Sequence, residues 1–165
     1  MSVGITLEEL FAWNLNSSDY WKSHLEANPN LLALPCSIGG TANVQEFIRH
    51  IWGAELRWAQ RLAGVPETPR DKTPTGPLAA LFDVHLQAAE IFRKVLDAPV
   101  ETWSDPYVLN FDWMPAEDRT VSRRKIALHA LFHSQRHWAQ LATLVRTAGF
   151  PSKFRGDLLF SPALR

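Results

Sequence analysis

The chain has 165 residues, and its 17 basic residues balance 17 acidic ones at a sequence pI near 7.0. This length suffices for one domain with a sizeable hydrophobic core, so we expect a single domain over residues 1–165. A balanced charge offers no electrostatic footprint for nucleic acid or for an anionic membrane surface, and neither is expected as a partner.

Cys36 is the only cysteine, which excludes an internal disulfide and fits a reducing compartment. The first ten residues, MSVGITLEEL, lack the basic and apolar regions of a secretory signal. No apolar run approaches the length that crosses a bilayer. These features predict a cytoplasmic protein that does not cross a membrane.

Two helices are predicted in the first half of the chain. A capping box, T-x-x-E, opens a helix over residues 6–26. Residues 28–40 carry two prolines and a Gly-Gly pair, so they form a connection. An Asn cap opens the second helix over residues 43–64, which stops at a glycine before the proline-rich loop of residues 65–77.

Two further helices are predicted in the second half. A proline at the first helical position starts a helix over residues 77–96, and Pro99 ends it. Residues 100–119 are expected to be irregular, with a short extended piece at residues 107–111. The segment 120–149 is rich in Ala and Leu and contains no Pro or Gly before its end, which predicts the longest helix.

Four long helices without a convincing strand pattern predict an all-α four-helix bundle. Residues 150–165 follow the last helix as a tail that carries several Phe and Leu residues. We expect this tail to dock on the body of the domain or on a second subunit, because it would otherwise expose apolar surface to water.

Three of the six histidines lie at four-residue intervals in the last predicted helix: His129, His133 and His137. Residues four apart lie one above the other on a helix, so His133 and His137 can offer two rings to one metal ion. They occupy the apolar stripe of the helix, where an unpartnered imidazole costs desolvation free energy. Alternatively, each ring is a core histidine satisfied by a backbone carbonyl or a carboxylate.

A metal site needs a further ligand from elsewhere, and the candidates are His24, His50, His85, Glu46 and Glu55. His50 stands out because it flanks the apolar stripe of the second helix, and Gly53 one turn later leaves room for a ligand. Glu46 is expected to reach back to the helix cap. His85 is expected to be a satisfied, partly buried histidine, and His24 to be solvated.

The blocks NVQEFIRHIWGAELRWAQRLAG and HALFHSQRHWAQLATLVRTAG, in a four-helix layout, resemble the DinB-like (YfiT-like) superfamily of metal-dependent enzymes. The resemblance extends over nearly the whole chain up to Gly149. Its most specific part is H-x-x-x-H followed by A-Q and L-x-R-x-x-G, here His133, His137, Ala139, Gln140, Arg146 and Gly149. The chain departs from many relatives at Trp138-Ala139, where they have Arg-Gly, which alters the pocket wall and leaves the ligands intact.

The resemblance implies that His50 joins His133 and His137 around one divalent transition metal, with His129 behind the ligands or in the pocket. Ligation by imidazole alone suits Zn²⁺ or Ni²⁺ first, and also Fe²⁺, over Mg²⁺ or Ca²⁺. Three protein ligands leave coordination positions open, as in catalytic sites. Such a metal activates either a low-molecular-weight thiol, for transfer or isomerisation, or water, for hydrolysis.

The residues expected near a small-molecule substrate are Arg57, Trp52, Arg136 and Gln140. The two arginines could equally be solvated or ion-paired, and Gln140 could hydrogen-bond a ligand histidine. The alternative function is a non-catalytic, metal-binding homodimeric module for a small molecule or a protein partner. The resemblance and the apolar tail predict a homodimer in either case. An enzyme requires a solvent-accessible pocket beside the histidines, whereas a structural module seals them.

Overall fold

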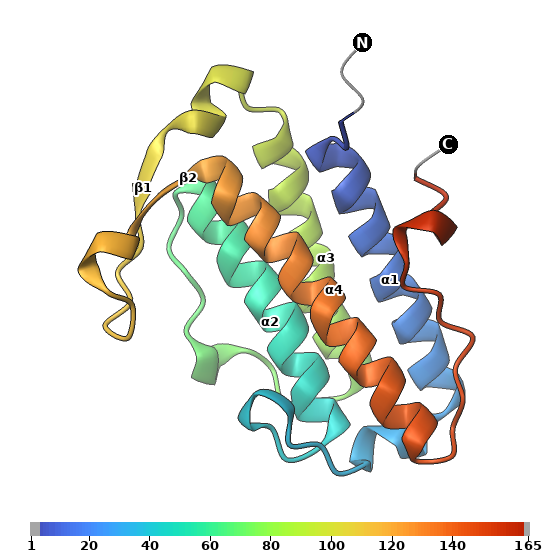
Figure 1. The fold of residues 1–165 in the computed structure, drawn as a ribbon. Helices are drawn as coiled ribbons and strands as arrows, with labels where there is room; N and C mark the ends of the chain where they lie inside the picture. Colours follow the sequence, from blue (N-terminus) through green and yellow to red (C-terminus); the bar gives the residue numbers. More distant parts are fainter. Residues whose placement is uncertain (1–3, 164–165) are drawn as a thin grey trace.

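Residues 4–163 are described by the computed structural model, and their four long helices run along one another (Figure 1). The helices are α1 (Leu7–Ala27), α2 (Val44–Ala63), α3 (Leu78–Leu96) and α4 (Arg123–Thr147). Short 3₁₀ turns occupy the connections, at Pro29–Ala33, Ile38–Gly40, Arg70–Lys72, Val100–Ser104, Ala116–Asp118 and Leu158–Phe160. The helix α2 packs against both α3 and α4. The predicted all-α four-helix bundle is confirmed.

The first two helices begin at side-chain caps that the sequence predicted. Thr6 Oγ1 accepts a hydrogen bond from the Glu9 amide, and the Glu9 carboxylate accepts one from the Thr6 amide. Asn43 Oδ1 accepts from the Glu46 amide at 2.9 Å, while Glu46 Oε2 accepts from the Ala42 amide at 2.8 Å. The Glu46 carboxylate is therefore engaged in starting α2.

A two-stranded sheet lies where the sequence predicted an irregular segment with one short extended piece. The strands β1 (Pro106–Val108) and β2 (Thr120–Ser122) are antiparallel, with Tyr107 opposite Val121. The expected extended piece at 107–111 is thus shifted, and the last helix begins at Arg123 instead of residue 120. Each strand has three residues, which is too short for an alternating pattern to be visible in the sequence.

The hydrophobic core contains two groups of buried side chains. One surrounds Trp21, Trp52 and Trp138, and the Trp138 ring centroid lies 6.1 Å from that of Trp21 and 6.0 Å from that of Trp52. The other surrounds Phe11 and Phe92, whose rings stack at 5.0 Å. Burial of these large aromatic surfaces against one another fixes how the four helices pack.

Five polar side chains, which we call the polar layer, are buried between the four helices: Asn14 and Ser17 of α1, Glu55 of α2, His85 of α3 and Gln135 of α4. Glu55 Oε2 lies 2.7 Å from His85 Nδ1, and Glu55 Oε1 accepts from Asn14 Nδ2 at 2.9 Å. Gln135 Nε2 donates to Asn14 Oδ1 and to Ser17 Oγ at 3.2 and 3.0 Å. One residue or more from every helix therefore joins a single buried network.

The chain after α4 runs back along α1 (Figure 1). The Phe154 ring lies 5.3 Å from the Tyr20 ring and 5.2 Å from the Trp21 ring, both in α1. Across the described residues, no helix combines the length and the apolar character that a bilayer crossing requires.

Candidate metal centre

Three histidines from two helices meet beside the core. His133 and His137 lie one turn apart on α4, and His50 faces them from α2. The Nε2 atom of His137 lies 3.3 Å from Nε2 of His50 and 3.2 Å from Nε2 of His133. The potential ligand atoms of the three residues all lie within 4.8 Å of one another. We call these three residues the histidine cluster.

Neighbouring charges and burial keep the histidine cluster neutral. Burial, followed by the charges of His137 and Arg57, lowers the pKa of His50 to about 4. Burial, followed by His137 and His50, lowers the pKa of His133 to about 3. The pKa of His137 is also lowered, mainly by burial. All three rings are therefore unprotonated at pH 7, the form in which imidazole binds a metal.

The protonated nitrogen of His137 is set by Gln140. The amide oxygen Oε1 of Gln140 lies 2.6 Å from His137 Nδ1 and can only accept, so Nδ1 carries the proton. His137 Nε2 consequently carries the lone pair and directs it at the other two rings. Hydrogen bonding of the non-ligating nitrogen orients metal-binding histidines in proteins generally.

The spacing of the nitrogens fits the ligand shell of a transition metal. Nitrogens bound at about 2.0–2.1 Å to a tetrahedral Zn²⁺ lie about 3.3–3.4 Å apart. The Nε2 separations of His137, 3.3 Å to His50 and 3.2 Å to His133, match that edge length. Among the residues in the described range, no carboxylate hydrogen-bonds to these rings, so a cation would not have to displace an ion pair.

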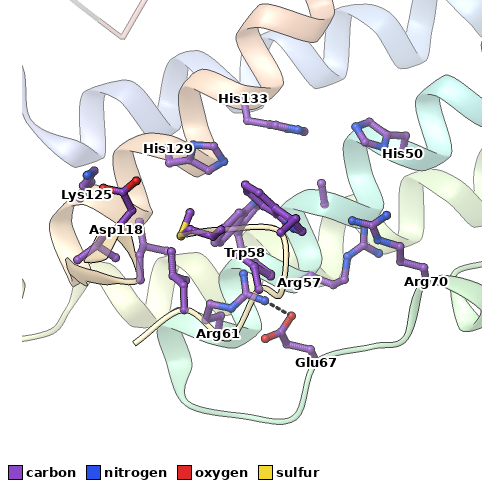
Figure 2. Close-up of a pocket in the computed structure, with 17 residues that line it drawn as sticks. His50, Arg57, Trp58, Arg61, Glu67, Arg70, Asp118, Lys125, His129 and His133 are labelled. Atoms are coloured by element: carbon purple, nitrogen blue, oxygen red, sulfur yellow. Dashed lines mark hydrogen bonds and ion pairs between the residues drawn. The ribbon is translucent and has the colours of Figure 1, made fainter. Parts of the chain in front are cut away.

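A pocket of about 690 Å³ lies beside the histidine cluster and contacts His50 and His133 directly (Figure 2). Its walls come from α2, from the N-terminal half of α4 and from the segment between β1 and β2. The aromatic and thioether side chains on these walls are Trp58, Phe111, Trp113 and Met114. A pocket of this volume accommodates a small molecule with one end near the histidines.

The residues predicted near a substrate lie in different places. His129 and Arg57 line the pocket, and the His129 ring contacts Trp58 at a centroid distance of 4.8 Å. Arg136 is exposed on α4, and its charge contributes to the lowered pKa values of His129 and the histidine cluster. Trp52 is fully buried in the core, where its indole donates to Ser18 Oγ at 3.3 Å, and it does not line the pocket.

The remaining ligand candidates lie away from the histidine cluster. Glu55 and His85 bind each other in the polar layer. The expectation that His24 is solvated is wrong, because its ring stacks on Tyr20 at 5.7 Å and its Nε2 is buried without a hydrogen-bond partner. Packing of Tyr20 and Trp21 of α1 against this ring explains the difference.

Sequence reasoning missed several charged residues of the pocket, namely Arg61, Glu67, Arg70, Asp118 and Lys125. Arg61 could have been predicted from the sequence, because it lies on the same face of α2 as His50, Ala54 and Arg57, at helical spacing. Glu67 and Arg70 lie in the proline-rich loop and Asp118 between the strands, where no periodicity indicates which side chains face the site.

A helical bundle whose second and fourth helices bring three neutral histidines together, two of them on the wall of an open pocket, defines a class of candidate metalloproteins. Within this class, the family model of the DinB superfamily matches residues 9–141. The chain belongs to the DinB superfamily. The matched range includes all three residues of the histidine cluster and ends before Arg146 and Gly149. Comparison with curated proteins gives no match.

Proposed function

We propose that this chain is a metal-dependent enzyme of the DinB superfamily in which His50, His133 and His137 hold one divalent transition metal. The convergence of three Nε2 atoms at the edge of an open pocket carries this proposal. Their all-imidazole donor set favours Zn²⁺ or Ni²⁺, with Fe²⁺ as a further candidate. The pocket also favours an enzyme over a sealed structural metal site.

The metal, when bound, would supply a Lewis acid that acidifies a coordinated thiol or water and polarises a carbonyl. Gln140 keeps the His137 proton on Nδ1, so Nε2 stays available as a donor. The His129 ring lies in the same pocket with a lowered pKa, caused first by burial and then by Arg136 and Arg61. His129 therefore offers a neutral imidazole that can accept a proton from a substrate.

The nucleophile is proposed to come from outside the protein. None of the described residues that line the pocket has a hydroxyl or thiol side chain. A low-molecular-weight thiol would serve as co-substrate in a transferase or isomerase, and water would serve in a hydrolase. A cytoplasmic location would supply a reduced thiol pool, which agrees with the single Cys36.

Metal content tests the ligand assignment. Tag-free protein purified without added metal is expected to contain about one equivalent of Zn, Ni or Fe by elemental analysis. The substitution His133→Ala is expected to remove it, while His129→Ala retains it, because His129 lies outside the group of three ligand atoms. Absence of metal from the wild type, even after reconstitution with Zn²⁺ and Ni²⁺, would refute the proposal.

Thiol binding separates the two chemistries. Protein loaded with Co²⁺ is titrated with 2-mercaptoethanol while its near-ultraviolet absorption is recorded. A thiolate-to-metal charge-transfer band that is absent from His133→Ala would support the thiol-dependent enzyme. A spectrum that does not change with thiol would favour the hydrolase, in which water occupies the open position.

A homodimer is part of this proposal. Phe132 in α4 and Phe160 in the tail are large apolar side chains with half of their surface exposed, at 53% and 46%. A second subunit would cover such side chains. Light scattering is expected to give the mass of a dimer, and a monomer mass would refute this part alone.

A further inference from the structure

The pocket carries more positive than negative charge, and the excess lies near the histidine cluster. Its basic side chains are Arg57, Arg61, Arg70 and Lys125, and its acidic ones are Glu67 and Asp118. Arg61 forms an ion pair with Glu67, drawn as a dashed line in Figure 2. Asp118 and Lys125 lie together at the end of the pocket away from His50 (Figure 2).

Arg57 and Arg70 remain without an acidic partner. Within residues 4–163, no carboxylate lies within ion-pair distance of either guanidinium. Figure 2 shows the two side chains next to each other beneath His50. Burial, and then the charge of Arg70, lowers the pKa of Arg57 to about 10, so the half-buried guanidinium is still charged at pH 7. A half-buried guanidinium beside a second cation is costly unless an anion joins them.

The position of Arg57 is built into α2. Its Nη1 donates to Thr73 Oγ1 at 3.4 Å, and Gly53 one turn earlier provides the space for this contact. A Cβ atom at Gly53 would lie 3.3 Å from Arg57 Nη1 and 3.1 Å from Thr73 Cγ2. The absent side chain at Gly53 therefore lets the guanidinium turn toward the loop and the pocket.

The position of Arg70 is fixed through its backbone. Arg49 Nη2 donates to the Arg70 carbonyl at 2.6 Å, and Arg49 Nε donates to the Thr73 carbonyl at 3.0 Å. Further along α2, Gln60 Oε1 accepts from the Thr68 amide at 2.7 Å. The proline-rich loop is thus bound to α2 on both sides of Arg70, which holds that residue near Arg57 before any ligand arrives.

The pocket wall beyond the arginines is aromatic. The Trp58 and Phe111 rings meet edge to face at 5.9 Å, and Trp113 stacks on Phe111 at 5.2 Å. The Arg61 guanidinium lies 4.4 Å from the Trp58 ring centroid. A wall of aromatic side chains suits an apolar body.

We propose that this pocket binds a small organic carboxylate, with the carboxylate on Arg57 and Arg70 and the apolar body against Trp58 and Phe111. The carboxylate end then lies beside His50, and the apolar body extends along the aromatic wall. The planar fork of a guanidinium matches a carboxylate in two parallel hydrogen bonds. No glycine lines the pocket in the described part of the chain, so it lacks the backbone-amide cradle typical of phosphate sites. This inference deepens the proposed function by naming its substrate class.

Calorimetry on the tag-free full-length protein tests the inference with three probes: 3-phenylpropionate, its neutral amide, and inorganic phosphate. The carboxylate is expected to bind at least about tenfold more tightly than the amide, because charge-assisted hydrogen bonds are lost in the amide. Arg57→Met and Arg70→Met are each expected to weaken carboxylate binding by about tenfold or more. Arg146→Met, an exposed arginine in the last turn of α4, is expected to bind it as the wild type does.

Equal binding of acid and amide, or unchanged binding in both pocket variants, would overturn the inference. Phosphate that displaces the carboxylate with equal affinity would overturn the assignment to carboxylates. Arg70 is exposed in a loop, so Arg70→Met should fold even if Arg57→Met does not. Wild-type protein stripped of metal with a chelator is expected to retain carboxylate binding. Loss of binding there would place the carboxylate on the metal and overturn the inference, whereas failure of the metal assignment alone leaves carboxylate binding intact.

Discussion

The histidine cluster and the polar layer share two helices and lie within one to two turns of each other along the chain. They differ in the partners that their buried polar groups have. In α2 the distance from His50 to Glu55 is five residues, and in α4 Gln135 lies between His133 and His137. In the polar layer, the Glu55 carboxylate faces both the His85 ring and the Asn14 amide. In the histidine cluster, three ring nitrogens face only one another.

The surroundings of the two regions differ in the same sense. The polar layer borders a cavity of about 20 Å³, whereas the histidine cluster opens on about 690 Å³. A buried imidazole with a carboxylate partner is satisfied inside the protein. Three neutral imidazoles without an anion, at the edge of an open pocket, are arranged for a cation from solution. The partner that the fold supplies, rather than the residue type, decides the role of each histidine.

Alanine substitution of one histidine in each region should separate the roles of the two regions. We expect His137→Ala to abolish metal binding, because it removes the Nε2 atom that lies between those of His50 and His133. We expect His85→Ala to retain about one equivalent of metal and to lower the denaturation midpoint. Elemental analysis and denaturant unfolding of both variants check this, with circular dichroism as the control for helix content. Metal loss in folded His85→Ala would show that the two regions are not independent.

Of these substitutions, replacement of Glu55 in the polar layer should lower the free energy of unfolding the most. Glu55→Ala leaves His85 and Asn14 without their acceptor in the core, and loss of one member of such a buried pair costs about 3–5 kcal/mol. The matched control is Glu90→Ala, which removes an exposed ion pair with Lys94 and should cost less than about 1 kcal/mol. Urea unfolding at equal m-values measures both. Equal losses would mean that the polar layer contributes no more than a surface pair.

Gln140 should affect the histidine cluster without affecting the fold. Gln140→Leu removes the acceptor that holds the proton on His137 Nδ1, and loss of such a partner weakens metal binding by about 10–100-fold. Gln140 is exposed, so the unfolding free energy should change little. Competition with a chromophoric chelator measures the affinity, with Gln87→Leu on the exposed face of α3 as the control. Unchanged affinity would assign His137 a proton position that does not depend on Gln140.

The parts of this structure that sequence reasoning predicted depend on neighbours along the chain. The caps at Thr6 and Asn43 and the glycine stop at Gly64 set helix ends within a few residues. The approach of His133 and His137 follows from helical geometry alone. The strands β1 and β2 instead depend on pairing between residues 106 and 122 across a loop, which no local pattern encodes.

The third member of the histidine cluster depends on tertiary packing. His24, His50 and His85 each lie on a different helix. Only the arrangement of α2 beside α4 brings one of them, His50, to His133 and His137. Resemblance to a family singled it out, whereas the residues alone left the choice open. Arg70 was not found at all, because its place beside Arg57 results from hydrogen bonds that Arg49 makes to a loop about twenty residues later. The binding of a metal by these residues remains a prediction.

Acidification should destabilise the metal-free histidine cluster by a smaller amount. In the folded chain the pKa values of His50 and His133 lie near 4 and 3, mainly because of burial, against an ordinary value of 6.5. Between pH 6.5 and 4 the unfolded chain therefore binds more protons than the folded chain, and the free energy of unfolding falls as the pH decreases. Above pH 6.5 these rings contribute no pH dependence.

The slope of this loss identifies its source. In chelator-treated protein, urea midpoints between pH 7 and pH 4 should fall less steeply for His133→Ala than for the wild type, because one of the depressed pKa values is then gone. Carboxylates that titrate near pH 4 contribute to both proteins and cancel in the comparison. Parallel curves would show that the His133 ring is not desolvated in the folded metal-free chain. In that case water entering through the open pocket would solvate the His133 ring, whereas in the polar layer a carboxylate of the protein is the partner of His85.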